Sequence, residues 1–296
     1  MTDPVYSPIA LLDEAIASAA FAIAPEKATE LANDPRIVGF GLALSADSGF
    51  TIRVDVETKE ATLPVFALEY LWCFSLLILT LVEEYQAAQL DEKETIDLRT
   101  SPQVSQAVNM LNWAHARMHH GDASQWPEES PKPQKTPAQS DVAYAVNEIF
   151  LSAIAWIIHH EIAHIRLGHG IETTYSVQEE TAADDEATKW IFSENLNDDV
   201  LLKRQLGMAV ALLSLQFLEE PRGKDSRVES HPPSVDRLFR CFDIAGVAQD
   251  GFIRALTTVA LQFQLANLNI ETPLDGNSWS DIMADALISF TTAGRD

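Results

Sequence analysis

The segment HHEIAHIRLGHG, residues 159–170, contains four histidines and one glutamate with spacings that could do chemistry. Within it, His160, Glu161 and His164 form the pattern HExxH. Because an α-helix turns once every 3.6 residues, both histidines of the pattern lie on one face, where two neutral nitrogens can reach one zinc ion. We therefore expect Zn²⁺ at His160 and His164. Glu161 lies beside them and is expected to take a proton from the metal-bound water and pass it to the leaving amine.

A third zinc ligand is needed, and the sequence offers two. His169 stands five residues after His164, whereas the pattern HExxHxxGxxH requires six and a glycine where Leu167 stands. Glu180 and Asp184 lie one helical turn apart in QEETAADDEATKWI. We predict that Glu180 is the ligand and that Asp184 accepts the outer N–H of a ligand histidine and fixes its tautomer. His169 is kept as the alternative third ligand.

Two further residues belong to the segment HPPSVDRL, residues 231–238. His231 is a catalytic candidate, because a histidine here could donate to the oxyanion formed when water attacks a peptide carbonyl. The alternative is that it is a loop residue without a role. Arg237 is expected to be a structural partner of an acidic residue near the metal, either Asp184 or Asp185.

Other arrangements of histidine have plainer interpretations. In a noncatalytic interpretation, His160 and His164 are hydrogen-bonded interior side chains and Glu161 pairs with Arg166. His115 and His119 form another one-turn pair, but no acidic residue lies between them and the predicted helix ends at Gly121. Since the helix dipole favours histidine near a C-terminus, we interpret this second pair as structural.

The motifs resemble a known group of enzymes. HEIAH followed by ETAAD is similar to the gluzincin metallopeptidases, and HPPSVDRL resembles a His-Pro segment of HtpX and CAAX prenyl protease relatives, which are membrane enzymes. Chain length, acidic character and the central position of HHEIAHIRLGHG are most similar to the Lit-type phage-exclusion peptidases. The resemblance implies zinc at His160 and His164, Glu161 as the base, elongation factor Tu as the substrate and activation by a phage component.

Composition excludes several classes of function. Lys and Arg number 20 against 44 Asp and Glu, a net charge of −24, which disfavours binding to nucleic acid or anionic membranes and favours basic protein segments. The N-terminus has no basic region typical of an export signal, and the two cysteines are far apart, so a cytoplasmic location is expected. The apolar run 70–82 is shorter than the roughly 20 residues needed to cross a bilayer, which favours a core helix.

Periodicity predicts an α+β protein that is mostly α, and the resemblance implies a zincin-like helical metallopeptidase core. A β-hairpin or small sheet is expected from the β-branched runs 36–44 and 50–57. Residues 121–140 contain four prolines and predict a loop. The predicted helices are one or two within 9–33, then 64–89, 103–120, one from 141 to either Gly168 or Gly170, 174–193, 198–219, 233–245, 250–268 and 278–291.

The expected organisation is an N-terminal part, 1–62, packed on a helical metallopeptidase domain, 63–296, or one continuous domain 1–296. Gluzincins usually hold substrate as an added strand beside an edge strand near the zinc helix. In this chain that edge strand would have to come from residues 36–56.

The residues thus predict a zinc-dependent endopeptidase, and the resemblance to Lit-type enzymes implies that it acts in phage exclusion on elongation factor Tu. Two alternatives stay open: a soluble regulatory metalloprotease that cuts a repressor, and a noncatalytic scaffold. In the scaffold His160, His164, His169 and Glu180 would close all four positions around a structural ion.

Overall fold

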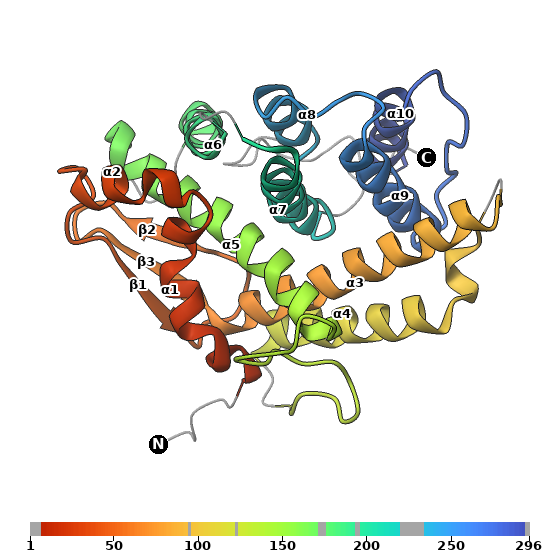
Figure 1. The fold of residues 1–296 in the computed structure, drawn as a ribbon, viewed down its shortest axis with the longest axis horizontal. Coiled ribbons are helices and arrows are strands. Elements are labelled where there is room, and N and C mark those ends of the chain that lie inside the picture. Colours follow the sequence, from red (N-terminus) through yellow and green to blue (C-terminus); the bar gives the residue numbers. More distant parts are fainter. Residues whose placement is uncertain are drawn as a thin grey trace.

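The structure is a computed structural model that describes residues 7–93, 96–121, 124–170, 176–192, 196–219 and 234–293. These residues form a mostly helical α+β fold with one small sheet near the N-terminus, as predicted (Figure 1). The α-helices are α1 (Asp13–Ala22), α2 (Ala28–Asn33), α3 (Val65–Leu90), α4 (Pro102–His120), α5 (Val142–Leu167), α6 (Val177–Ile191), α7 (Asp198–Gln216), α8 (Ser234–Ile244), α9 (Phe252–Asn267) and α10 (Trp279–Thr292). The 3₁₀ helices are η1 (Pro8–Leu12), η2 (Pro25–Lys27) and η3 (Leu98–Thr100), and the strands are β1 (Gly41–Ser45), β2 (Arg53–Asp55) and β3 (Glu60–Pro64).

The sheet differs from the hairpin expected between residues 36–44 and 50–57. Its order is β1-β3-β2, so the two predicted strands do not pair with each other. Instead β3 lies between them, parallel to β1 and antiparallel to β2. The tight turn joins β2 to β3, where Lys59 has a φ of 58° and its N–H bonds to Asp55 O at 2.7 Å. The sequence prediction missed β3 because its segment EATLP is short and ends in a proline that was assigned to the next helix.

Helix α5 crosses the centre of the molecule and is packed against α1, α3, α6 and α7 (Figure 1). Helices α5 and α7 cross closely at Ser152 and Gly207. A Cβ added at Gly207 would lie only 2.6 Å from Ser152 Cβ, so no larger residue fits there without a shift. Helix α3, which also packs against α5, runs side by side with α4 in the opposite direction. One hydrophobic cluster joins residues of the N-terminal helices, such as Ile9 and Ile16, with the core of α5 and α7. The division at residue 62 stays a prediction.

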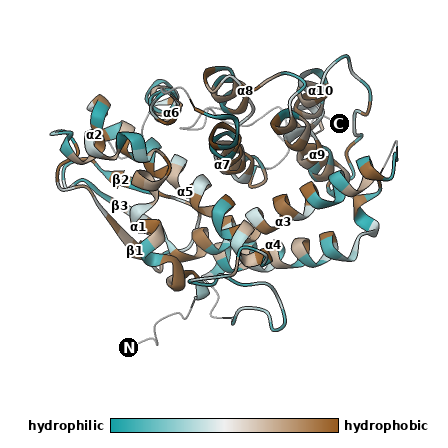
Figure 2. Ribbon diagram, viewed as in Figure 1, coloured by the Kyte–Doolittle hydropathy of each residue, from teal (hydrophilic) through white to brown (hydrophobic). Residues whose placement is uncertain are grey.

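Two helices, α3 and α5, are long and apolar enough to cross a membrane by length and composition. Each helix has 26 residues. The argument that the apolar run 70–82 is too short to cross a bilayer is therefore wrong, because the helix that contains it, α3, extends well beyond the run on both sides. Burial is a better criterion than length for deciding whether a long apolar helix belongs to the core. In their most apolar windows, 83% of α3 and 72% of α5 is buried inside the protein, so both helices pack as core helices of this fold. Figure 2 shows the hydropathy of each residue along them.

Candidate metal centre and active site

The local sequence sets where α5 ends and α6 begins. Gly168 takes the left-handed conformation with a φ of 66°, and its N–H and that of His169 close onto carbonyls of the last turn of α5. Helix α6 begins with a capping box in which Ser176 and Glu179 satisfy each other's backbone N–H groups. Glu180 therefore lies in the first turn of α6, on a side that faces α5.

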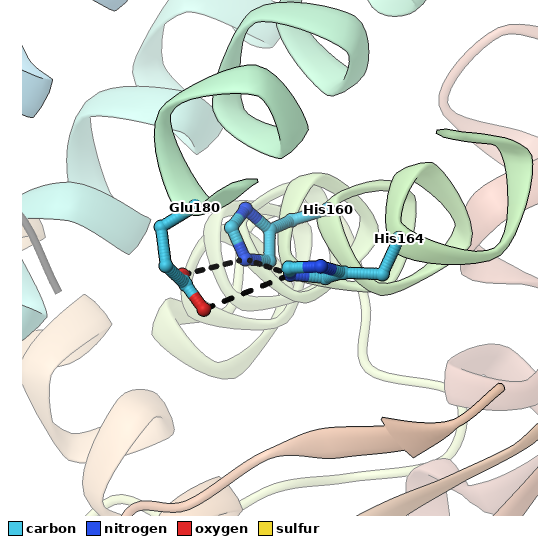
Figure 3. Close-up of side chains that lie close together, drawn as sticks. All are labelled: His160, His164 and Glu180. Carbon is cyan, nitrogen blue, oxygen red and sulfur yellow. Dashed lines mark hydrogen bonds and ion pairs between the residues drawn. The ribbon is translucent and has the colours of Figure 1, made fainter. Parts of the chain in front are cut away.

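Three side chains converge between these helices: His160 and His164 of α5 and Glu180 of α6 (Figure 3). The two Nε2 atoms are 3.1 Å apart, and the Glu180 oxygens lie 3.3 Å from His160 Nε2 and 3.8 Å from His164 Nε2. All three side chains are buried, and their ligand atoms lie within 4.8 Å of one another. Within the described ranges this is the one group of three or more ligands with such convergence. Two imidazole nitrogens and one carboxylate oxygen fit zinc and leave one coordination position open.

The outer nitrogen of His160 is held by a buried ion pair. Its Nδ1–H donates to Asp184 Oδ1 at 2.8 Å, and Arg237 of α8 donates to both oxygens of the same carboxylate at 2.7 and 2.8 Å. Burial favours the neutral carboxyl, but the charges of Arg237 and His160 outweigh it and hold the pKa of Asp184 well below its usual range. Asp184 thus stays ionised and keeps His160 Nε2 directed toward Glu180.

Without a metal, His160 is a strong base. Burial alone would lower its pKa, but the hydrogen bonds to Asp184 and Glu180 outweigh burial and raise the pKa to about 10. A metal ion bound at this imidazole would have to displace a proton from it, so metal binding here would release protons.

His169 lies against Nδ1 of His164, the ring nitrogen that faces away from Glu180. The Nδ1 atoms of His164 and His169 are 2.8 Å apart, so one ring donates and the other accepts. This contact places His169 on the side of His164 opposite to the Nε2 atom that faces Glu180, and His169 is absent from the converging group.

Glu161 is held by the sheet. Its Oε2 accepts the backbone N–H of Val54 in the edge strand β2 at 2.8 Å, and its side chain is buried. Burial raises its pKa to about 7 against the opposing charge of His160. A carboxyl that titrates near neutrality suits a general base. No sequence pattern predicts the role of Val54, because the contact uses a backbone group that every residue except proline carries.

Arg166 binds on the other side of α5 and not to Glu161. It donates to Asp34 at 2.9 Å, lies 3.8 Å from Glu186, and stacks over the ring of Trp190 at 3.7 Å. Asp34 also bonds to Arg36, and its arginine hydrogen bonds and charges lower its pKa from 3.8 to about 2. These contacts tie the end of α5 to α2 and α6.

Two other histidines are His159 and the predicted catalytic residue His231. His159 faces away from the metal ligands, where its Nε2–H donates to Ala20 O of α1 at 3.0 Å. His231 lies outside the described residues, so its role in catalysis stays a prediction.

The match to known sequences defines the class of protein. Residues 62–257 match the Peptidase U49 family, and the chain belongs to this family of peptidases. It is also 37% identical over 291 residues to the cell death peptidase of Escherichia coli (strain K12), a match that covers 95% of this chain and 96% of that relative. No solved structure matches the chain at a significant level. Two conclusions follow: the chain is a peptidase of Lit type, and the converging group of His160, His164 and Glu180 lies inside the matched region.

Proposed function

We propose that this peptidase is a zinc-dependent endopeptidase of gluzincin type, with His160, His164 and Glu180 as the zinc ligands. The observation that carries the proposal is the convergence of their ligand atoms within 4.8 Å in a buried setting. A buried cluster of this kind is costly unless its charges are compensated, and a divalent cation would compensate them.

Each side chain around the cluster has a defined task in this proposal. Zinc would supply a Lewis acid that polarises the scissile carbonyl and acidifies the attacking water. Glu161 takes the proton of that water at Oε1, because Oε2 already accepts the N–H of Val54, and then passes the proton to the leaving amine. Asp184 keeps the Nε2 lone pair of His160 directed into the site, and Arg237 holds Asp184 in place.

The proposed biological role is phage exclusion in the cytoplasm through the cleavage of one host protein. The name of the relative, cell death peptidase, supports a toxic peptidase activity. We propose elongation factor Tu as the substrate and a phage-derived peptide as the activator, following the resemblance to Lit-type enzymes. The net charge of −24 favours a basic segment in either partner.

The first experiment measures the zinc-to-protein ratio of the purified chain beside the H160A and E161Q variants. We expect about one zinc per native chain and per E161Q chain, and a large loss in H160A. Cleavage of elongation factor Tu in the presence of phage peptide should be lost in E161Q, since a neutral amide cannot accept the proton. A folded native chain without zinc would overturn the metal proposal. Zinc binding without cleavage of elongation factor Tu would overturn only the substrate.

A further inference from the structure

A second pair of histidines lies on α4, far along the chain from the proposed zinc ligands. The Nε2 atoms of His115 and His119 are 3.1 Å apart, and their rings meet edge to face with centroids 4.4 Å apart. The two residues occupy positions one helical turn apart, so their side chains lie over the same face of α4. His119 is exposed and His115 is half-buried.

The geometry of this pair matches that of the proposed zinc ligands on α5. The Nε2 atoms of His160 and His164 are also 3.1 Å apart, and both ring pairs are near perpendicular, at 72° on α4 and 77° on α5. Two nitrogens bound to one tetrahedral zinc at ordinary bond lengths would be about 3.3–3.4 Å apart. Only a small adjustment of either ring is therefore needed to place an ion between the nitrogens of the α4 pair.

We propose that His115 and His119 form a second metal site, which takes a divalent transition ion such as Zn²⁺, Ni²⁺ or Cu²⁺. Imidazole nitrogen suits these ions and disfavours Mg²⁺ and Ca²⁺, which prefer oxygen. In the described part of the chain no third ligand converges with this pair, since the converging group found there is the one on α5 and α6. Water completes the coordination, so this site binds more weakly than a site with three protein ligands.

The surroundings of the pair favour a fixed chelate. The ring of His115 packs against the buried ring of Tyr70 at a centroid distance of 6.2 Å, which restrains one of the two ligands. His119 is exposed and leaves the other coordination positions open to water. An ion bound here would join two successive turns at the end of α4. Met118 of the last turn accepts the N–H of Gly49 at 2.7 Å, so the ion would also stabilise the attachment of the segment that leads into β2.

Zinc titration of the full-length chain tests this inference, with H119Q as the variant and H120Q as its matched control. Both histidines are exposed at the same end of α4, but only His119 bonds to His115. We expect the native chain and H120Q to show a tight class and a weaker class of zinc binding. H119Q should keep the tight class and lose the weaker one. The native chain and H120Q should also be retained on a nickel-chelate resin to higher imidazole concentration than H119Q.

Two outcomes would overturn the inference: H119Q keeps every class of zinc binding that the native chain shows, or H120Q loses the same class as H119Q. In the first case the α4 pair would be a hydrogen-bonded histidine pair only. The H160A variant separates this inference from the proposed active site, because it should lose the tight class and keep the weaker one.

Discussion

Replacing Asp184 by asparagine tests the link between the buried ion pair and the metal centre. In the native chain, Arg237 is 7% exposed and donates two hydrogen bonds to Asp184, which also accepts the Nδ1–H of His160. D184N removes the charge that compensates the guanidinium and leaves a neutral acceptor for the histidine. Breaking a buried ion pair in this way costs about 3–5 kcal/mol in the free energy of unfolding. Loss of the partner of a ligand histidine lowers metal affinity by roughly 10- to 100-fold.

The neighbouring Asp185 provides a matched control. It also pairs with an arginine of α8, Arg240, but the side chain of that arginine is 53% exposed. Because water screens an exposed pair, D185N should cost about 1 kcal/mol or less. It should leave zinc affinity unchanged, since Asp185 has no hydrogen bond to His160 among the contacts described.

The assay combines urea unfolding of the metal-free protein with competition for zinc against a chelator. A second variant, D184N/R237M, removes both charges and should recover most of the lost stability, because no unpaired guanidinium is left. Its zinc affinity should stay low, because His160 still lacks a carboxylate partner. If D184N and D185N behave alike in both measurements, the assignment of Asp184 as the residue that orients His160 is wrong.

Three further predictions concern the metal, the packing of α5 and acid stability. Added zinc should raise the melting temperature of metal-free native protein and of E161Q by more than that of H160A, which keeps only the weaker site proposed on α4, as differential scanning calorimetry can show. G207A should lower the free energy of unfolding by about 1–3 kcal/mol or more, because the new Cβ would lie 2.6 Å from Ser152 Cβ. A urea midpoint of G207A equal to that of the native chain would contradict the close crossing of α5 and α7. The pKa of Asp34 is lowered from 3.8 to about 2 by its arginine partners, so its contribution is present above about pH 4 and is lost as the pH falls toward 2. D34N should therefore be less stable than the native chain by about 2 kcal/mol near neutral pH, with a gap that narrows on acidification; a gap independent of pH would contradict the shift.

The helices could be predicted well from sequence because their signals are local. The long apolar run of α5 predicted its length, and the two glycines that follow it predicted an end at Gly168 or Gly170. The structure ends the helix at Leu167 and places the cap at Gly168. The sheet could not be predicted in the same way. Strand pairing depends on contacts between segments distant in sequence, and the short β3 has too few residues to show a pattern of its own.

The candidate site shows the same division between local and distant signals. The pattern HExxH predicted that His160 and His164 converge, because residues four positions apart lie on the same face of a helix. Whether His169 or Glu180 completes the group depends on how α6 returns over α5, which no local pattern encodes. The contact of His169 with His164 and that of Val54 with Glu161 were not predicted, since each depends on the path of the backbone between elements.

The side chains and backbone groups of the active site come from widely separated parts of the chain. Val54 belongs to β2, the proposed ligands to α5 and α6, and Arg237 to α8. During synthesis the N-terminal elements can fold first, but Asp184 has no arginine partner until Arg237 has left the ribosome. A nascent chain and any fragment cut before α8 therefore contain the HExxH helix but lack the ion pair between Asp184 and Arg237. For a peptidase whose proposed substrate is a component of protein synthesis, this order would delay the pairing of Asp184 with Arg237 until α8 has been synthesised.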